Sequence, residues 1–203
     1  MRIMSICVAP VSPLWGIDHP DHAVVNSAIK KQCVSSLDNP QSILVRKIGL
    51  EGDEQADFSV HGGLNKAIYA YPSEHYSFWN EFLQTSAPQQ KPIKAGFVGE
   101  NLSVEGFLED CVWIGDIWQI GEVELQVTQL REPCFKLNAR MRHKGASKAM
   151  TQSGRCGWYL QVNQGGLIQA GQAVLVTPER REISIKMQKD FLLKKNRQNE
   201  LPL

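Results

Sequence analysis

The chain has 203 residues, which is enough for one sizeable hydrophobic core. Its 22 basic and 21 acidic residues leave no overall field to attract nucleic acid, and no apolar run is long enough to span a membrane. Five cysteines without a C-x-x-C pair, and the lack of a cleavable signal pattern, favour a reducing cytoplasm and exclude the ordinary zinc-knuckle and thioredoxin motifs. The 16 glycines and 10 prolines favour a turn-rich β architecture.

The first part of the chain predicts two strands separated by a long loop. Residues 3–8 and 43–48 are rich in β-branched and apolar side chains, whereas residues 16–40 are mostly polar and contain turn-forming residues. We therefore expect the polar stretch to form no regular structure.

A helix is predicted after Pro72, because proline suits the first turn of a helix. Tyr76, Trp79, Phe82 and Leu83 then recur at helical spacing. This stripe predicts a helix face that packs on the core rather than an aromatic ligand site.

Beyond residue 100 the pattern is that of short strands in close succession. Val123, Leu125 and Val127 alternate with polar residues, and the Gly115-Asp116 and Gly121-Glu122 pairs are typical of tight turns. Many short strands at this spacing predict a mainly β protein with a few helices and a closed or nearly closed barrel. The predicted strands are 101–104, 111–114, 117–120, 123–128, 158–162 and 173–176, with a short helix over 146–152.

The composition changes at Pro178. Ile183, Met187 and Phe191 fall on one helical face among mostly basic neighbours. A basic amphipathic helix, a helix packed on the barrel and a solvated terminus all fit this pattern.

Cys134 has the surroundings of a reactive thiol. Pro133 before it predicts a helix start, which places the thiol in a first turn with unpaired amides, between the cations Arg131 and Lys136. These features favour the thiolate over the thiol. The alternative is a small buried hydrophobic residue, which is the common role of a free cysteine.

Acidic residues gather in a glycine-containing stretch near residue 55. Asp53, Asp57 and His61 stand at four-residue steps, which would suit divalent metal ligands on one helical face. Gly52 and the glycines after His61 disfavour a helix, however, so a loop with hydrogen-bonding carboxylates fits better.

Three glycine clusters could form ligand-binding turns. Gly62 and Gly63 would let the backbone approach an anion, with Lys66 as a counter-charge. Residues 96–102 lack the lysine and hydroxyl of a phosphate-binding loop and lead into a strand, which favours a turn that lines a pocket. Arg155 stands between glycines before a strand, where it could hold a phosphate or carboxylate in forked geometry.

Taken together and in order, these motifs resemble the MOSC family, named after the C-terminal domain of molybdenum cofactor sulfurases. The residues of these motifs are most similar to those of a stand-alone bacterial branch of the family, which is associated with resistance to N-hydroxylated purines. The motifs are GLEGDEQAD (49–57), HGGLNKA (61–67), YPSEHY (71–76), GFVGENL (96–102), IGD (114–116) and REPCFK (131–136).

The resemblance implies a MOSC-type β-barrel that binds the molybdenum cofactor, with Cys134 as the protein ligand to molybdenum. A thiolate is a soft ligand, and coordination by a metal deprotonates a thiol. The cofactor's phosphate and polar ring would need amides and cations. The expected cofactor-binding residues are Arg131, Lys136, Lys66, Gly62, Gly63, Gly99, Glu100, Asn101 and Arg155.

The resemblance also implies reduction of a small N-hydroxylated substrate to the amine, with Asp53, Asp57, His61 or Glu100 delivering protons. His61 has the ordinary pKa closest to neutrality. The chain shows no iron–sulfur spacing and no dinucleotide fingerprint, so electrons are expected from a separate flavin- or iron–sulfur-type reductase.

Relatives of this kind often carry a three-helix domain after the barrel. We therefore expect a barrel domain over residues 1–177, with the motifs strongest over 45–176, and a helical tail over 178–203 in which that domain is truncated or missing. No pyridoxal phosphate is expected, because that cofactor belongs to a separate part of the sulfurases. Two other functions remain open: a sulfur carrier with a persulfide on Cys134, and a non-catalytic cofactor-binding module.

Overall fold

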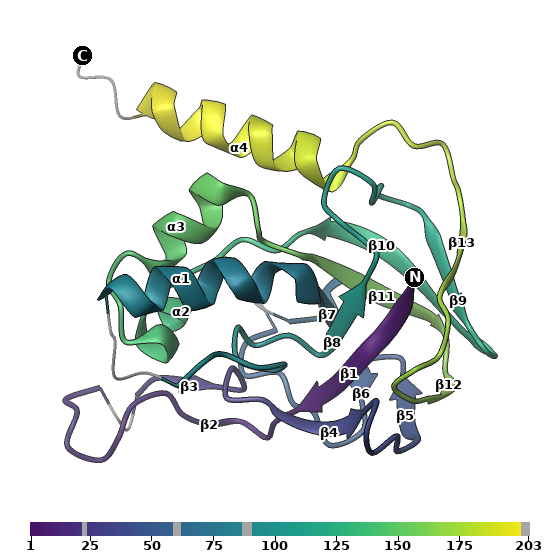
Figure 1. Cartoon of the computed structure of the whole chain (residues 1–203), viewed down its shortest axis with the longest axis horizontal. Helices are drawn as coiled ribbons and strands as arrows, with labels where there is room; N and C mark the ends of the chain where they lie inside the picture. The colour runs from purple at the N-terminus through teal and green to yellow at the C-terminus, as the bar shows by residue number, and fades with distance from the viewer. Residues whose placement is uncertain (22–23, 59–61, 87–90, 200–203) are drawn as a thin grey trace.

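The computed structural model describes residues 1–21, 24–58, 62–86 and 91–199 (Figure 1). Its strands are β1 (Arg2–Val8), β2 (Ser12–Pro13), β3 (Asn26–Ser27), β4 (Gln32–Ser36), β5 (Ile43–Arg46), β6 (Gly49–Leu50), β7 (Ile68–Pro72), β8 (Leu102–Glu105), β9 (Ile117–Ile120), β10 (Val123–Leu130), β11 (Trp158–Gln164), β12 (Gly166–Ile168) and β13 (Leu175–Thr177). Its helices are α1 (Tyr76–Ser86), α2 (Phe135–Met141), α3 (Ala146–Ser153) and α4 (Ile185–Asn199), with 3-10 turns η1 (Leu64–Lys66) and η2 (Ser73–His75). The fold is therefore mainly β, as the sequence predicts.

One curled sheet of eight strands, in the order β13-β9-β10-β11-β7-β8-β1-β4, forms a half-barrel. All pairings in it are antiparallel except that of β7 with β8. The segment just before β13 bonds back to β1: the Ile3 amide donates to the Gln172 carbonyl (3.0 Å) and the Gly171 amide donates to the Ile3 carbonyl (2.8 Å). The curl thus brings distant parts of the sheet together, and a second sheet, β12-β5-β6, lies beside it.

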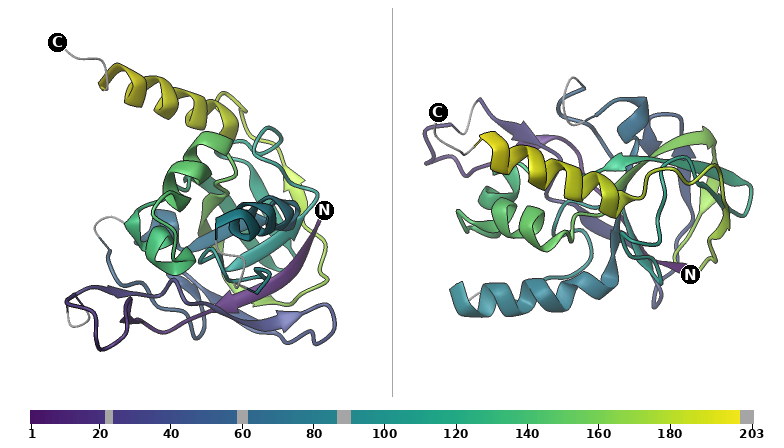
Figure 2. Two further views of the ribbon diagram at one scale, coloured as in Figure 1. Left: turned by 60° about the vertical axis from the view of Figure 1, so that its left-hand side comes forward. Right: turned by 90° about the horizontal axis from the view of Figure 1, so that it is seen from above.

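The helices α1, α2 and α3 gather at one end of the sheet, as the two views of Figure 2 show. The predicted stripe of α1 does pack on the core: Trp79 and Leu83 are buried, and Tyr76 and Phe82 are partly buried against it. Pro72 is not in this helix, because it ends strand β7 in an extended conformation before η2 begins.

The expected loop over residues 16–40 is wrong in two parts, because the short strand β3, which pairs with β2, and strand β4 both lie within it. Strand β4 pairs with β1 at the edge of the sheet. Its sequence, QCVSS, is mostly polar because an edge strand keeps one side towards solvent, so it lacks an apolar pattern.

The expected strand over residues 111–114 is also wrong. Its backbone groups bond to the segment before α4 instead of to a neighbouring strand: the Ile114 amide donates to Ile183 (3.0 Å), and Val112 accepts from Ile185 (2.9 Å). Strand β7 was not expected, because all five of its residues are buried and show no alternation.

Helix α4 follows this segment and passes α3 before it extends away from the barrel (Figure 1). Ile185 is buried, whereas Ile183, Met187 and Phe191 are exposed, so the predicted apolar face does not pack on the core. Among the described residues, no helix has both the length and the apolar composition to cross a membrane.

Candidate functional site

A cavity of about 110 Å³ lies where the ends of β7, β10 and β11 meet the loops that carry residues 27–31, 53–56 and 98–101. Segments far apart in the sequence therefore contribute to one site. Seven residues expected from the sequence line it: Asp53, Lys66, Gly99, Asn101, Arg131, Cys134 and Lys136.

Cys134 lies at the start of helix α2 and is partly exposed in this cavity. It is the N-cap residue in an extended conformation, not a first-turn residue, and its carbonyl accepts from the Leu137 amide (3.0 Å). The expected position inside the first turn is therefore wrong by one residue, and α2 has only seven residues. The nearby charge supports a reactive thiol better than the helix start does, because Arg131 interacts electrostatically with Cys134.

Arg131 is buried at 6% exposure and still lines the cavity. Its Nη1 donates to the Met150 sulfur (3.0 Å), and its guanidinium carbon lies 5.3 Å from the centre of the Tyr69 ring. No ion pair joins Arg131 to a carboxylate within the described parts of the chain. A buried cation without an acidic partner is costly, and a bound anion would relieve that cost.

Two tyrosines flank this guanidinium, but they do not neutralise it. Burial raises the pKa of both Tyr69 and Tyr159, although Arg131 opposes the rise. Both phenols are therefore uncharged at neutral pH. Lys66 extends over the Tyr159 ring, with its Nζ 5.7 Å from the ring centre, so a second positive charge lies near the same wall.

Asp53 is held by several hydrogen bonds. Its Oδ1 accepts from Lys31 Nζ (2.5 Å) and from the Ala9 amide (2.8 Å), and its Oδ2 accepts from Asn101 Nδ2 (2.8 Å). The Lys31 and Asp53 side chains are each 7% exposed. Asn101 also accepts from the Tyr69 amide (3.0 Å) through its side-chain oxygen. This network fixes the cavity wall and leaves Asp53 with a cation beside it.

Glu100 lies beneath the cavity and does not line it. Its carboxylate accepts from the Tyr76 hydroxyl (2.5 Å) and from the amides of Gly96 (2.7 Å) and Val98 (3.1 Å). It therefore shapes the turn at residues 96–101. Burial raises its pKa above the ordinary value of 4.5, although these hydrogen bonds oppose the rise.

This raised pKa predicts a pH dependence of stability. The folded protein holds the Glu100 proton more tightly than the unfolded chain, so this group's contribution falls as pH rises from 4.5 towards the raised pKa. We expect Glu100→Gln to be destabilising, since an amide NH₂ would face the Val98 amide, and to be more destabilising at pH 5 than at pH 8. Urea unfolding at both pH values checks this, with Glu105→Gln as an exposed control. A destabilisation that grows with pH would contradict it.

The remaining expected site residues do not join the cavity. His61 lies outside the described residues. Asp57, Gly62 and Gly63 are described but do not line it, and the Gly63 amide donates to the Gln55 side chain (2.6 Å). Arg155 lines a different cavity, so the structure does not bring it to Cys134.

Sequence reasoning missed Lys31, Tyr69 and Tyr159 as members of this site. Lys31 lies in the stretch that was expected to be an irregular loop, and no pattern there marks it. The two tyrosines lie in strands β7 and β11, where an aromatic residue is the usual core residue. Across the described chain, no three His, Cys, Asp or Glu side chains form a metal-binding group.

The half-barrel and this cavity, with a cysteine beside a buried guanidinium, define the class of protein. A family model described as the MOSC domain matches residues 57–175, and the chain belongs to this family. The MOSC family is associated with binding of the molybdenum cofactor.

Two curated relatives are similar over most of this chain. It is 37% identical to protein YiiM of Escherichia coli over 142 residues and 38% identical to protein YflK of Bacillus subtilis over 130 residues. The matches cover 70% and 64% of this chain but only 62% and 56% of those relatives, so the chain spans less than two thirds of their length. A protein named "Reductase" from Gibberella moniliformis is 36% identical over 151 residues, which cover 74% of this chain and 25% of that protein.

Among solved structures, YiiM from Geobacillus stearothermophilus superposes with a TM-score of 0.71 at 30% identity, covering 96% of this chain and 84% of the other. YiiM from Escherichia coli superposes with a TM-score of 0.69 at 24% identity, covering 100% and 80%, which supports the fold alone. The expected MOSC-type β-barrel is thus confirmed.

Proposed function

We propose that this protein binds the molybdenum cofactor through Cys134 and reduces N-hydroxylated compounds of the hydroxylaminopurine type to amines. The observation that carries the proposal is the arrangement of Cys134 and Arg131 in one cavity, with a buried guanidinium that has no carboxylate partner among the described residues. A thiolate suits a soft-leaning metal, and a forked cation suits a phosphate.

The residues present fit such a group. Cys134 would supply the sulfur ligand, and Arg131, Lys66 and Lys136 would hold the cofactor's phosphate and polar ring. Lys136 is already positioned, because its Nζ donates to the Asn26 carbonyl (3.2 Å). When bound, the molybdenum centre supplies the two-electron chemistry that removes the oxygen of the substrate's N–OH group.

The chain's own groups orient the substrate and supply protons. Asp53 is the expected acidic residue that lines the cavity, and its pairing with Lys31 keeps a proton-carrying cation at the same wall. Glu100 is buried beneath the wall and acts on the shape of the turn, so we assign it a positioning role.

Electrons would come from a separate flavin- or iron–sulfur-type reductase, and the reaction would take place in the cytoplasm. Support for a reductive system comes from the relative named "Reductase", in which the matching segment is part of a much longer chain. The five free cysteines suit a reducing compartment.

The test is reduction of 6-N-hydroxylaminopurine, with reduced methyl viologen as donor, by protein from a host that makes molybdenum cofactor. We expect turnover by the wild type and by Cys111→Ser, an exposed-cysteine control, and none by Cys134→Ser. Equal rates for the two variants would refute the role of Cys134. Metal-free protein with a labile sulfur adduct on Cys134 would favour the sulfur carrier, and metal-loaded protein without turnover would favour the non-catalytic module.

A further inference from the structure

A second cavity, of about 230 Å³, shares no lining residue with the cavity that contains Cys134. It lies between the loop before β11, the segment around residue 109 and the first turns of α4. Three cations from two distant segments line it: Arg155, Lys186 and Lys189.

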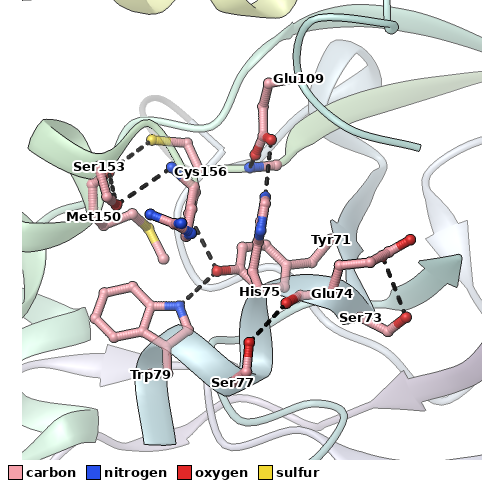
Figure 3. Close-up of polar contacts among 12 residues, drawn as sticks. Tyr71, Ser73, Glu74, His75, Ser77, Trp79, Glu109, Met150, Ser153 and Cys156 are labelled. Atoms are coloured by element: carbon pink, nitrogen blue, oxygen red, sulfur yellow. Dashed lines mark hydrogen bonds and ion pairs between the residues drawn. The ribbon is translucent and has the colours of Figure 1, made fainter. Parts of the chain in front are cut away.

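Arg155 is fixed at this cavity by its backbone and its side chain. Its carbonyl accepts from the Tyr71 hydroxyl (3.1 Å), and the same hydroxyl accepts from Trp79 Nε1 (2.6 Å), a contact drawn in Figure 3. Its guanidinium carbon lies 4.4 Å from the centre of the Phe78 ring. Arg155 makes no ion pair with any carboxylate of the described segments. A stacked guanidinium without an acidic partner keeps its donors available for an anion.

The two lysines come from α4 and are held beside the same cavity. The Lys186 amide donates to the Glu109 carbonyl (2.9 Å), which fixes the start of the helix. The Lys189 side chain packs over Gly154, where an added Cβ would lie 2.9 Å from its Cδ. Lys189 also pairs with Asp190 at 2.7 Å, so its charge is shared.

Two carboxylates also line this cavity, and one of them, Glu109, directs its hydrogen bonds to groups other than the three cations. Glu109 Oε2 pairs with His75 Nε2 (2.9 Å), as Figure 3 shows, and Glu109 Oε1 accepts from the Gly157 amide (3.0 Å). Asp110 is the other carboxylate that lines the cavity. With Asp190 paired to Lys189, three carboxylates match the three cations in number, but neither Arg155 nor Lys186 makes an ion pair with a carboxylate among the described residues.

We propose that this cavity is a second ligand site, which takes a small molecule or ion bearing a phosphate or carboxylate group. Arg155 binds the anionic group in forked geometry, and Lys186 and Lys189 bind it from the opposite side. The ligand then bridges α4 to the loop before β11. This proposal stands independently of the molybdenum chemistry.

The experiment measures binding of inorganic phosphate and of malonate by calorimetry, and the unfolding temperature, with sodium chloride holding the ionic strength constant. We expect saturable binding of at least one anion and a raised unfolding temperature. Arg155→Gln should weaken binding by about tenfold or more, since hydrogen bonds to charged groups contribute about 1.5–3 kcal/mol. Lys186→Gln should weaken binding as well. Because the Lys186 side chain is exposed, this substitution should leave the fold intact, so misfolding would not account for the weaker binding.

The matched control is Arg46→Gln, which removes an exposed arginine on β5 and should leave binding unchanged. The two anions show which group the site prefers. Chloride acting as well as both anions would overturn the proposal, and so would Arg155→Gln and Lys186→Gln binding like Arg46→Gln. Binding lost in Lys136→Gln but kept in Lys186→Gln would place the anion in the Cys134 cavity and would equally overturn it.

Discussion

Replacing Arg131 with methionine is expected to weaken retention of the molybdenum cofactor by about 10- to 100-fold, since a charged hydrogen bond contributes about 1.5–3 kcal/mol. The same change is expected to make the cofactor-free protein more stable, by about 1 kcal/mol, because an apolar side chain avoids the cost of burying a charge that has no carboxylate partner among the described residues. Met150, which contacts the guanidinium, would then pack against another thioether.

The distinctive outcome is that Arg131→Met weakens cofactor binding and raises the stability of the cofactor-free protein. For a domain of this size, 1 kcal/mol corresponds to a rise of about 2–4 °C in the unfolding temperature. Cofactor content after dialysis and thermal unfolding of cofactor-free protein measure the two effects. Arg131→Lys is the control, because it keeps the charge but loses the fork, and it should show no gain in stability. A methionine variant that loses stability and keeps its cofactor would show that Arg131 is only a structural residue.

Gly157→Ala is expected to destabilise the fold by about 3 kcal/mol or more, because two penalties combine. Gly157 has φ of +66°, and an added Cβ would lie 2.4 Å from the Ala70 carbonyl oxygen of the neighbouring strand. A backbone atom cannot move aside as a side chain can. The shift would also disturb both cavities, since the Gly157 carbonyl accepts from the Arg131 amide (3.1 Å) and its amide donates to Glu109 (3.0 Å).

The matched control for this change is Gly121→Ala. Gly121 has a similar φ of +58°, but the nearest atom to an added Cβ is the Gln172 side-chain nitrogen at 3.6 Å. It should cost only the conformational penalty, about 1–2 kcal/mol. Urea unfolding of both variants separates the two effects, and equal losses would show that the close approach at Gly157 is relieved at no cost.

Strand β10 and helix α1 were predictable because each has one buried side and one less buried side, which leaves a periodic pattern in the sequence. Sequence periodicity does not reveal the strands at the edge and at the centre of the sheet. The edge strand β4 carries polar residues, and the central strand β7 is buried on both faces, so neither alternates. Residues 111–114 look like a strand but bond to the segment before α4, a partner that local sequence does not reveal.

Some residues of the candidate site were likewise predictable from the sequence, and others were not. Arg131, Cys134 and Lys136 could be found because one short segment carries all three. Lys31 could not, since only the folded chain brings it to Asp53. Arg155 has a suitable motif for an anion and precedes the end of β11 that lies beside Arg131, but its side chain lines a different cavity from that of Cys134.

The central claim is that Cys134 holds a molybdenum cofactor in the cavity beside Arg131. The most direct measurement is bound molybdenum, by elemental analysis, in wild type, Cys134→Ala and Cys33→Ala purified from hosts that can and cannot make the cofactor. Cys33 is an exposed cysteine that does not line the cavity. The account predicts molybdenum in wild type and Cys33→Ala from the competent host only, and little in Cys134→Ala. Equal molybdenum in all the samples would contradict it.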